Sequence, residues 1–155
     1  MTIRTETAED QAFLVEAYQA SRAAEISMFG WDEASIREFA QMQHTMRRRS
    51  YELQHPDALY LIIEFNGLPA GTLIVEEGSS RVHLTDIFVL AEFRRRGIGR
   101  EVLTRLQQKA KDSNVPLTLN VAADNEPAIT LYREMGFKII TENQIHYAME
   151  WTPGR

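Results

Sequence analysis

A strand, a helix and a second strand follow one another in the middle of the chain, and this order constrains the fold more than any other feature. Residues 81–90 and 116–121 have the pattern typical of strands. Between them, residues 97–111 place an apolar side chain at every fourth position, as on one face of a helix: Ile98, Val102, Leu106 and Ala110. Because a helical crossover joins parallel strands, we predict a parallel strand pair with a right-handed connection.

The segments on either side of this unit predict antiparallel strands and further helices. Asn66-Gly67 is typical of a tight hairpin turn, and Gly136 is typical of a helix end. Two helices are expected before the hairpin, from about Thr7 and from a cap at Asp32, with a break at Phe29-Gly30-Trp31. Five further strands are expected, at residues 2–6, 59–65, 70–76, 137–141 and 145–151. Another helix is expected at residues 127–135.

The pattern as a whole predicts one α/β domain over residues 1–155. We expect a mixed sheet of the α+β kind, with antiparallel N-terminal strands, a central parallel pair and helices on both faces. The chain has 155 residues, of which 44% are hydrophobic and 25% charged, an ordinary globular composition. The absence of cysteine excludes disulfides, thiolate metal sites and a cysteine nucleophile.

Composition also limits where the protein works and what it binds. No secretory leader or membrane-spanning run is apparent, so we expect a cytoplasmic protein without a membrane partner. The four histidines show no metal-ligand spacing, so no metal is expected. The net charge of −5 argues against a nucleic-acid partner.

One segment departs from this acidic balance. Residues 94–111 carry seven basic residues and one acidic residue, about +6, which leaves about −11 for the rest of the chain. One interpretation of this basic run is simply the solvated face of a helix. A basic patch on an acidic body also suits a compact anionic ligand, because it attracts negative charge locally.

The residues at the start of this segment favour the second interpretation. The sequence from Arg94 to Arg100 reads Arg-Arg-Arg-Gly-Ile-Gly-Arg and joins a strand to a helix. A helix N-terminus leaves about four amides unpaired and attracts anions. Gly97 and Gly99 have no Cβ to keep a phosphate from those amides, and flanking arginines add charged donors. The sequence lacks the P-loop pattern and the third glycine of the dinucleotide fingerprint, so another phosphate-bearing ligand is indicated.

Arg94-x-x-Gly97-x-Gly99 resembles the acyl-CoA signature of the GNAT superfamily of N-acetyltransferases. The strand before it, Leu84 to Leu90, is similar to that family's cofactor-contacting strand, and the stretch from Leu119 to Phe137 resembles the second half of the family pattern. The resemblance implies a GNAT-like fold and transfer of an acetyl group from acetyl-CoA to a primary amine of a small molecule or peptide.

The resemblance also implies which residues hold acetyl-CoA. The pyrophosphate would lie on the amides of the loop, and the pantetheine arm would pair with the strand like a peptide. Asn125 would cap the next helix or bond the arm, although Asp124 could cap equally well. The cofactor-binding residues implied are Ile87, Phe88, Val89, Arg94, Arg95, Arg96, Gly97, Ile98, Gly99, Arg100, Asn125, Ala128 and Tyr132.

Two residues are candidates for the chemistry. In the family, the tyrosine that matches Tyr132 donates a hydrogen bond to the departing thiolate; the alternative is a core tyrosine beside Leu131 and Met135. Asp86 is the leading candidate for the base that deprotonates the amine, and the alternative is a carboxylate on the polar face of its strand. His83 is a strand residue that alternates with Thr85, and Glu25 is a weaker candidate base.

The acceptor region is expected around the break between the first two helices, with Glu25, Phe29 and Trp31 as substrate-binding residues. The two aromatic residues could instead be a hydrophobic staple. A non-catalytic acyl-CoA-binding regulatory module is the alternative to an enzyme, and a monomer and a homodimer are both compatible with the sequence.

Overall fold

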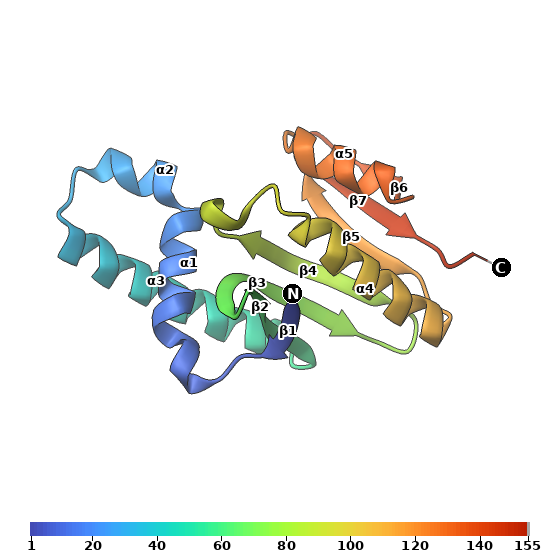
Figure 1. The fold of residues 1–155 in the computed structure, drawn as a ribbon. Helices are drawn as coiled ribbons and strands as arrows, with labels where there is room; N and C mark the ends of the chain where they lie inside the picture. The colour runs from blue at the N-terminus through green and yellow to red at the C-terminus, as the bar shows by residue number, and fades with distance from the viewer. Residues whose placement is uncertain (155) are drawn as a thin grey trace. The chain divides into compact units, whose positions relative to one another are not determined.

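The computed structural model describes residues 1–154 and has one seven-stranded sheet with the order β1-β2-β3-β4-β5-β7-β6 (Figure 1). The strands are β1 Thr2–Thr5, β2 Ala58–Phe65, β3 Leu68–Glu77, β4 Val82–Val89, β5 Leu117–Ala122, β6 Lys138–Glu142 and β7 His146–Trp151. The helices are α1 Gln11–Ser21, α2 Ala23–Ile26, α3 Glu33–Gln54, α4 Ile98–Ser113 and α5 Glu126–Glu134. Every strand and helix expected from the sequence is present, and the mixed α/β class is confirmed.

The contacts within the chain divide it into two compact units. Unit 1 comprises residues 1–73 and 87–93, and unit 2 comprises residues 74–86 together with residue 94 onward. Strands β3 and β4 each contribute residues to both units. The single domain expected over residues 1–155 stays a prediction.

Unit 1 is built on an antiparallel pair and two packed helices. β1 pairs with β2 from Thr2 opposite Glu64 to Thr5 opposite Leu61, and α1 packs against α3. Asn66 and Gly67 both have positive φ, 53° and 77°, which confirms the tight hairpin between β2 and β3. The fully buried residues of this unit include Ala40, Ile62, Ile63 and Ala70.

The first helix begins later than the sequence predicts. Residues 8–10 form a 3₁₀ turn, and α1 starts only at Gln11. The Thr7 amide donates to the Asp10 carboxylate at 2.7 Å, so Asp10 stabilises this tight turn at the entry to the helix.

Asp10 is also the centre of an ion-pair network in unit 1. Both of its oxygens accept from the Arg4 guanidinium, at 2.8 and 2.9 Å, and Arg4 reaches Glu64 on β2 at 3.2 Å. Asp10 is 7% exposed. The Arg4 hydrogen bonds, assisted by that from Thr7, hold the pKa of Asp10 well below its ordinary value.

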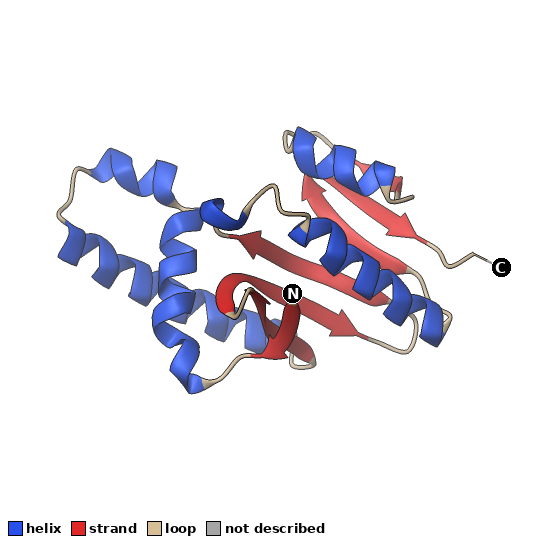
Figure 2. Ribbon diagram, in the orientation of Figure 1, coloured by secondary structure: helices blue, strands red, loops and turns tan. Residues whose placement is uncertain are grey.

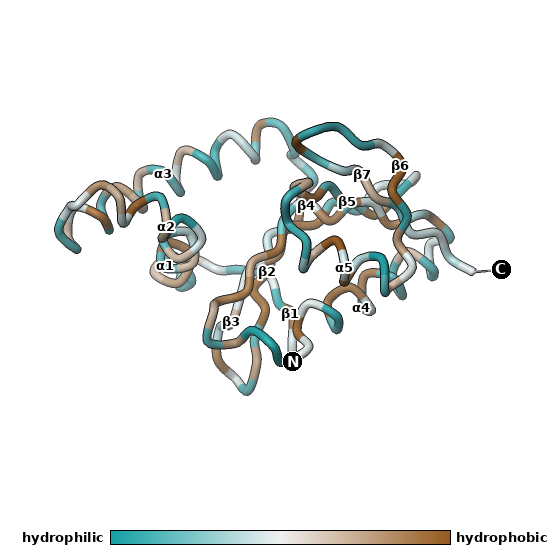
Figure 3. Tube along the Cα trace, turned by 90° about the horizontal axis from the view of Figure 1, so that it is seen from above, coloured by the Kyte–Doolittle hydropathy of each residue, from teal (hydrophilic) through white to brown (hydrophobic). Residues whose placement is uncertain are grey.

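Unit 2 contains the parallel pair predicted from the strand–helix–strand order. β4 and β5 pair in parallel at Val82–Leu117, His83–Thr118 and Leu84–Leu119. β5 then pairs antiparallel with β7, and β7 with β6. Helices α4 and α5 lie on the same face of β5 and β7 (Figures 1, 2 and 3). The predicted apolar stripe of α4 is buried in full: Ile98, Val102, Leu106 and Ala110.

Gly71 in β3 marks an unusually close approach of two backbones within unit 1. A Cβ at this position would lie 2.3 Å from the Phe88 carbonyl oxygen and 3.2 Å from the Val89 Cα. The neighbouring Leu90 amide donates to the Ala70 carbonyl at 2.9 Å. Only glycine leaves room for this contact, so Gly71 sets how closely β3 lies beside the end of β4.

Replacing Gly71 by alanine should therefore destabilise the fold by about 3 kcal/mol, because the added methyl collides with backbone rather than with a movable side chain. Chemical denaturation measures the effect. Gly99→Ala is the matched control, since its Cβ would meet only the Leu131 side chain at 3.5 Å and should leave stability nearly unchanged. Equal stability of the two variants would contradict the close approach.

Asp10→Asn should lower the free energy of unfolding by about 2 kcal/mol at neutral pH, because it removes the charged partner of Arg4. The folded-state pKa of Asp10 is depressed, so its contribution is complete above about pH 5 and is lost as the pH falls below about 4. The difference from wild type should thus narrow in acid, as measured by denaturation at several pH values. Glu9→Gln, an exposed neighbour with the same change of charge, should show no such trend.

Candidate functional site

The loop that enters α4 has the backbone geometry of an anion site. Gly97 caps the helix with φ +77°, and the first helical hydrogen bond runs from the Glu101 amide to the Gly97 carbonyl at 3.0 Å. The amides of residues 98–100 therefore precede any acceptor within the helix. Together with the helix dipole, these amides present partial positive charge at the loop.

Arg95 adds a second left-handed position to this loop, with φ +62°. A non-glycine residue in this region costs about 1–2 kcal/mol, which the surrounding structure must offset. Backbone strain of this kind is concentrated at ligand-binding sites, so the conformation of Arg95 favours a ligand-binding role for the loop. The sequence predicted Gly97 as the special position but not Arg95.

The side chain of Arg100 does not extend over the loop. Its guanidinium donates to the Glu134 carboxylate at 2.7 Å, an ion pair between α4 and α5. Two further contacts join these helices, since Gln107 donates to the Met135 carbonyl at 2.9 Å and position 99 approaches Leu131. The Arg100 amide belongs to the first turn of α4, while its guanidinium links the two helices.

The parallel pairing of β4 with β5 stops before either strand ends. Leu84 and Leu119 are the last pair, whereas Thr85 and Asp86 continue β4 and residues 120–122 continue β5. The Thr85 hydroxyl oxygen is buried and has no hydrogen-bond partner among residues 1–154. Such an orphaned polar atom, at the point where two strands stop pairing, fits a site that binds a polar ligand. The sequence indicates Thr85 only as a strand neighbour of His83.

His83 is occupied within the sheet. Its Nδ1 lies 2.7 Å from the Thr118 hydroxyl, its partner residue on β5, which supports the strand interpretation of this histidine.

Tyr132 and Asp86 interact electrostatically within unit 2. Tyr132 lies on α5, is 9% exposed, and its ring lies 5.7 Å from that of Phe137. Burial raises the pKa of the Tyr132 phenol, and the nearby negative charge of Asp86 raises it further. Asp86 alternates along β4 with the buried Val82 and Leu84 and is itself partly buried. The phenol therefore keeps its proton at neutral pH and can act as a donor.

Asn125 caps α5. Its side-chain oxygen accepts from the Ala128 amide at 3.4 Å, and its carbonyl accepts from Ile129 at 3.0 Å. This supports the capping role rather than that of Asp124. The α5 N-terminus follows the end of β5 in unit 2.

In unit 1, the end of β4 contributes Ile87, Phe88 and Val89, each partly buried. Gly71 lies directly against the backbone of Phe88 and Val89. A glycine inside a strand pattern is the sequence feature that could have predicted this contact.

The residues expected to bind the acceptor lie at the tip of the helical part of unit 1. Phe29, Trp31 and Phe39 form an aromatic cluster with ring centroids 4.8 to 5.7 Å apart. Glu25 is paired with Arg22 at 2.9 Å and is largely exposed. The assignment of Glu25, Phe29 and Trp31 to acceptor binding stays a prediction.

A groove of about 920 Å³ lies in the same unit, between α1, α2 and α3. Small apolar side chains such as Ala12, Ala20 and Ala23 line it together with polar residues such as Glu16 and Gln41. No pattern in the sequence predicts this groove. Among residues 1–154, no group of three or more metal-ligating side chains could hold a metal ion. No helix in the same range is long and apolar enough to span a membrane.

The sequence is similar to those of known acetyltransferases. The profile of the acetyltransferase (GNAT) family matches residues 15–137. An N-alpha-acetyltransferase of Sulfurisphaera tokodaii is 29% identical over an alignment of 110 residues. The alignment covers 62% of this chain and 66% of that protein, just under two thirds of its length.

Solved structures of similar fold cover almost the whole chain. The PaiA N-acetyltransferase of Thermoplasma acidophilum, in complex with coenzyme A, is 18% identical with a TM-score of 0.72, over 98% of both chains. The ribosomal-protein-S18-alanine N-acetyltransferase of Escherichia coli is 23% identical with a TM-score of 0.69, over 97% of this chain and 92% of that one.

Proposed function

The chain belongs to the acetyltransferase (GNAT) family, and on that premise we propose that it moves an acetyl group from acetyl-CoA to a primary amine of a small molecule or peptide. The observation that carries the proposal is the pairing of an anion-binding loop before α4 with a buried, protonated tyrosine on α5. The first suits the diphosphate of the donor, and the second suits its leaving thiolate.

The loop fits a diphosphate. Left-handed backbone at Arg95 and Gly97 and the amides of residues 98–100 supply main-chain donors, and Arg94, Arg95 and Arg96 supply positive charge. The buried Thr85 hydroxyl lacks a partner in the described chain and would gain one from a polar ligand. Ile87, Phe88 and Val89, which follow Asp86 in β4, stay our prediction for the backbone that holds the pantetheine arm.

When bound, acetyl-CoA supplies an acyl thioester whose thiol is the leaving group. An ordinary phenol has a pKa near 10 and a thiol near 8.5, and burial widens this gap at Tyr132. Full transfer of the phenol proton is therefore uphill by more than about 2 kcal/mol. We infer that Tyr132 stabilises the developing thiolate by donating a hydrogen bond while keeping its proton.

Asp86 is proposed to receive the proton of the amine, directly or through water. A lysine-like amine with a pKa near 10.4 loses its proton at pH 7 at a cost of about 4.6 kcal/mol, so a nearby carboxylate lowers the barrier. The effect of Asp86 on the pKa of Tyr132 supports this proposal, because it requires the carboxylate to lie near the phenol. The amine then attacks the thioester directly, without an acyl-enzyme.

Gly97→Glu should abolish the rise in melting temperature that acetyl-CoA produces, because it places a negative charge at the phosphate loop. The fold should persist, since a Cβ at Gly97 meets no atom within 4 Å and the cost is mainly the left-handed φ. Gly97→Asn is the matched control, neutral and tolerant of this φ, and it should retain most of the shift. An undiminished shift in Gly97→Glu would place the diphosphate elsewhere.

Tyr132→Phe should lower kcat about 10²-fold while leaving the affinity for acetyl-CoA nearly unchanged, because only the hydrogen bond to the leaving group is lost. Release of free CoA with a panel of amines measures the rate. Wild-type activity should not fall between pH 8 and about 10 through ionisation of the tyrosine, since its pKa lies above the ordinary value.

Asp86→Asn provides the companion measurement. Its activity should recover toward high pH, where the amine loses its proton unaided, whereas that of Tyr132→Phe should not. If acetyl-CoA binds wild type but no amine raises CoA release above background, the protein is a binding module and the catalytic proposal fails.

A further inference from the structure

Helix α3 carries an apolar stripe on the side that faces away from its own unit. Ala40 is fully buried and His44 lies beside Tyr18 of α1, so these positions mark the inner side. Met42 and Met46 are two residues further along the helix, about half a turn away, and are 52% and 59% exposed. Leu53, on the same outer side, is 85% exposed.

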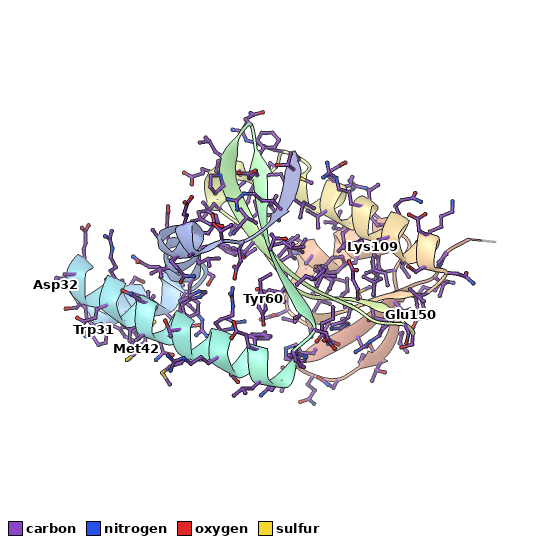
Figure 4. The ribbon with its side chains drawn as sticks, turned by 90° about the horizontal axis from the view of Figure 1, so that it is seen from below. Trp31, Asp32, Met42, Tyr60, Lys109 and Glu150 are labelled. Atoms are coloured by element: carbon purple, nitrogen blue, oxygen red, sulfur yellow. The ribbon has the colours of Figure 1, made fainter. Side chains whose placement is uncertain are left out.

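These residues have the spacing of a helix-packing seam. Phe39, Met42, Met46, Arg49 and Leu53 follow at alternating steps of three and four, which is the spacing of two-helix packing. We call these five positions the outer seam. Figure 4 shows Trp31 and Met42 along one edge of α3, and Figure 3 shows hydrophobic and hydrophilic residues alternating along the helix. Phe39 also joins the seam to the aromatic cluster at the start of the helix.

Two charged residues of α3 are placed so that they can pair between two copies of the helix. Glu38 lies beside the seam in the N-terminal half of α3, and Arg49 lies on the same edge in the C-terminal half, eleven residues later. If two copies of α3 pack antiparallel with the two-fold axis level with His44, Met42 of one copy faces Met46 of the other. Arg49 then lies level with Phe39 and next to Glu38 of the second copy.

We propose that the outer seam is the interface of a homodimer in which two α3 helices pack antiparallel about a two-fold axis. The same patch serves both copies, as a two-fold interface requires. The methionines supply adaptable apolar surface, and two equivalent Glu38–Arg49 pairs set the antiparallel direction. This proposal goes beyond the acetyl-transfer reaction and does not depend on it.

Sedimentation equilibrium and light scattering over a concentration series test the proposal. Wild type should have about twice the monomer mass of 17.8 kDa, and Met42→Glu with Met46→Glu should be monomeric. Leu68→Glu is the control, because it adds the same charge at another exposed apolar position, 58% exposed, and should stay dimeric. Circular dichroism and thermal melting check that each variant is folded.

Charge reversal tests the antiparallel direction. Glu38→Arg alone and Arg49→Glu alone should each raise the dimer dissociation constant at least about tenfold, because like charges then face each other. An equal mixture of the two variants should recover dimers, since every facing pair is again opposite in sign. The double variant should recover them as well.

Three results would overturn the proposal. A wild-type protein that is monomeric at every concentration would leave the seam to another partner. A dimer that survives the two glutamates in the seam would have a different interface. Single charge reversals that bind as tightly as wild type would exclude the antiparallel arrangement.

Discussion

The arrangement of unit 2 depends on the parallel pairing of β4 with β5, which involves only three residue pairs. Helix α4 returns the chain so that β5 lies beside β4, and residues 82–84 pair in parallel with residues 117–119. Each strand is then followed by a loop and a helix N-terminus. Because pairing with β5 stops at Leu84, Thr85 and Asp86 lie where β4 is no longer paired with β5. We propose that this part of β4 takes part in the reaction.

The distribution of charge reconciles the two interpretations of the basic segment. Arg105 pairs with Glu101 on the α4 surface, Lys109 with Glu77, and Arg100 with Glu134. These residues are the solvated helix face, and their charges are largely balanced by neighbours. The three successive arginines that precede Gly97 are the part of the segment that we assign to an anion, together with the amides of the first helical turn.

Much of this architecture could be predicted because local rules and burial agree. The four-residue stripe of α4, the hairpin at Asn66-Gly67 and the helix end at Gly136 all form as expected. What could not be predicted depends on neighbours distant in sequence. Gly71 is required by a backbone that lies seventeen residues away, and the orphaned Thr85 hydroxyl results from where two strands cease to pair. The partner of Arg100 is 34 residues along the chain, so its sequence context suggested a ligand instead.

Direct contacts join the first half of α4 to α5, the helix that carries Tyr132. Arg100, in the first turn of α4, pairs with Glu134 on α5, and Gln107 donates to the Met135 carbonyl just after α5. The position of Tyr132 relative to the first turn of α4 therefore depends on direct contacts between the two helices as well as on the strands beneath them.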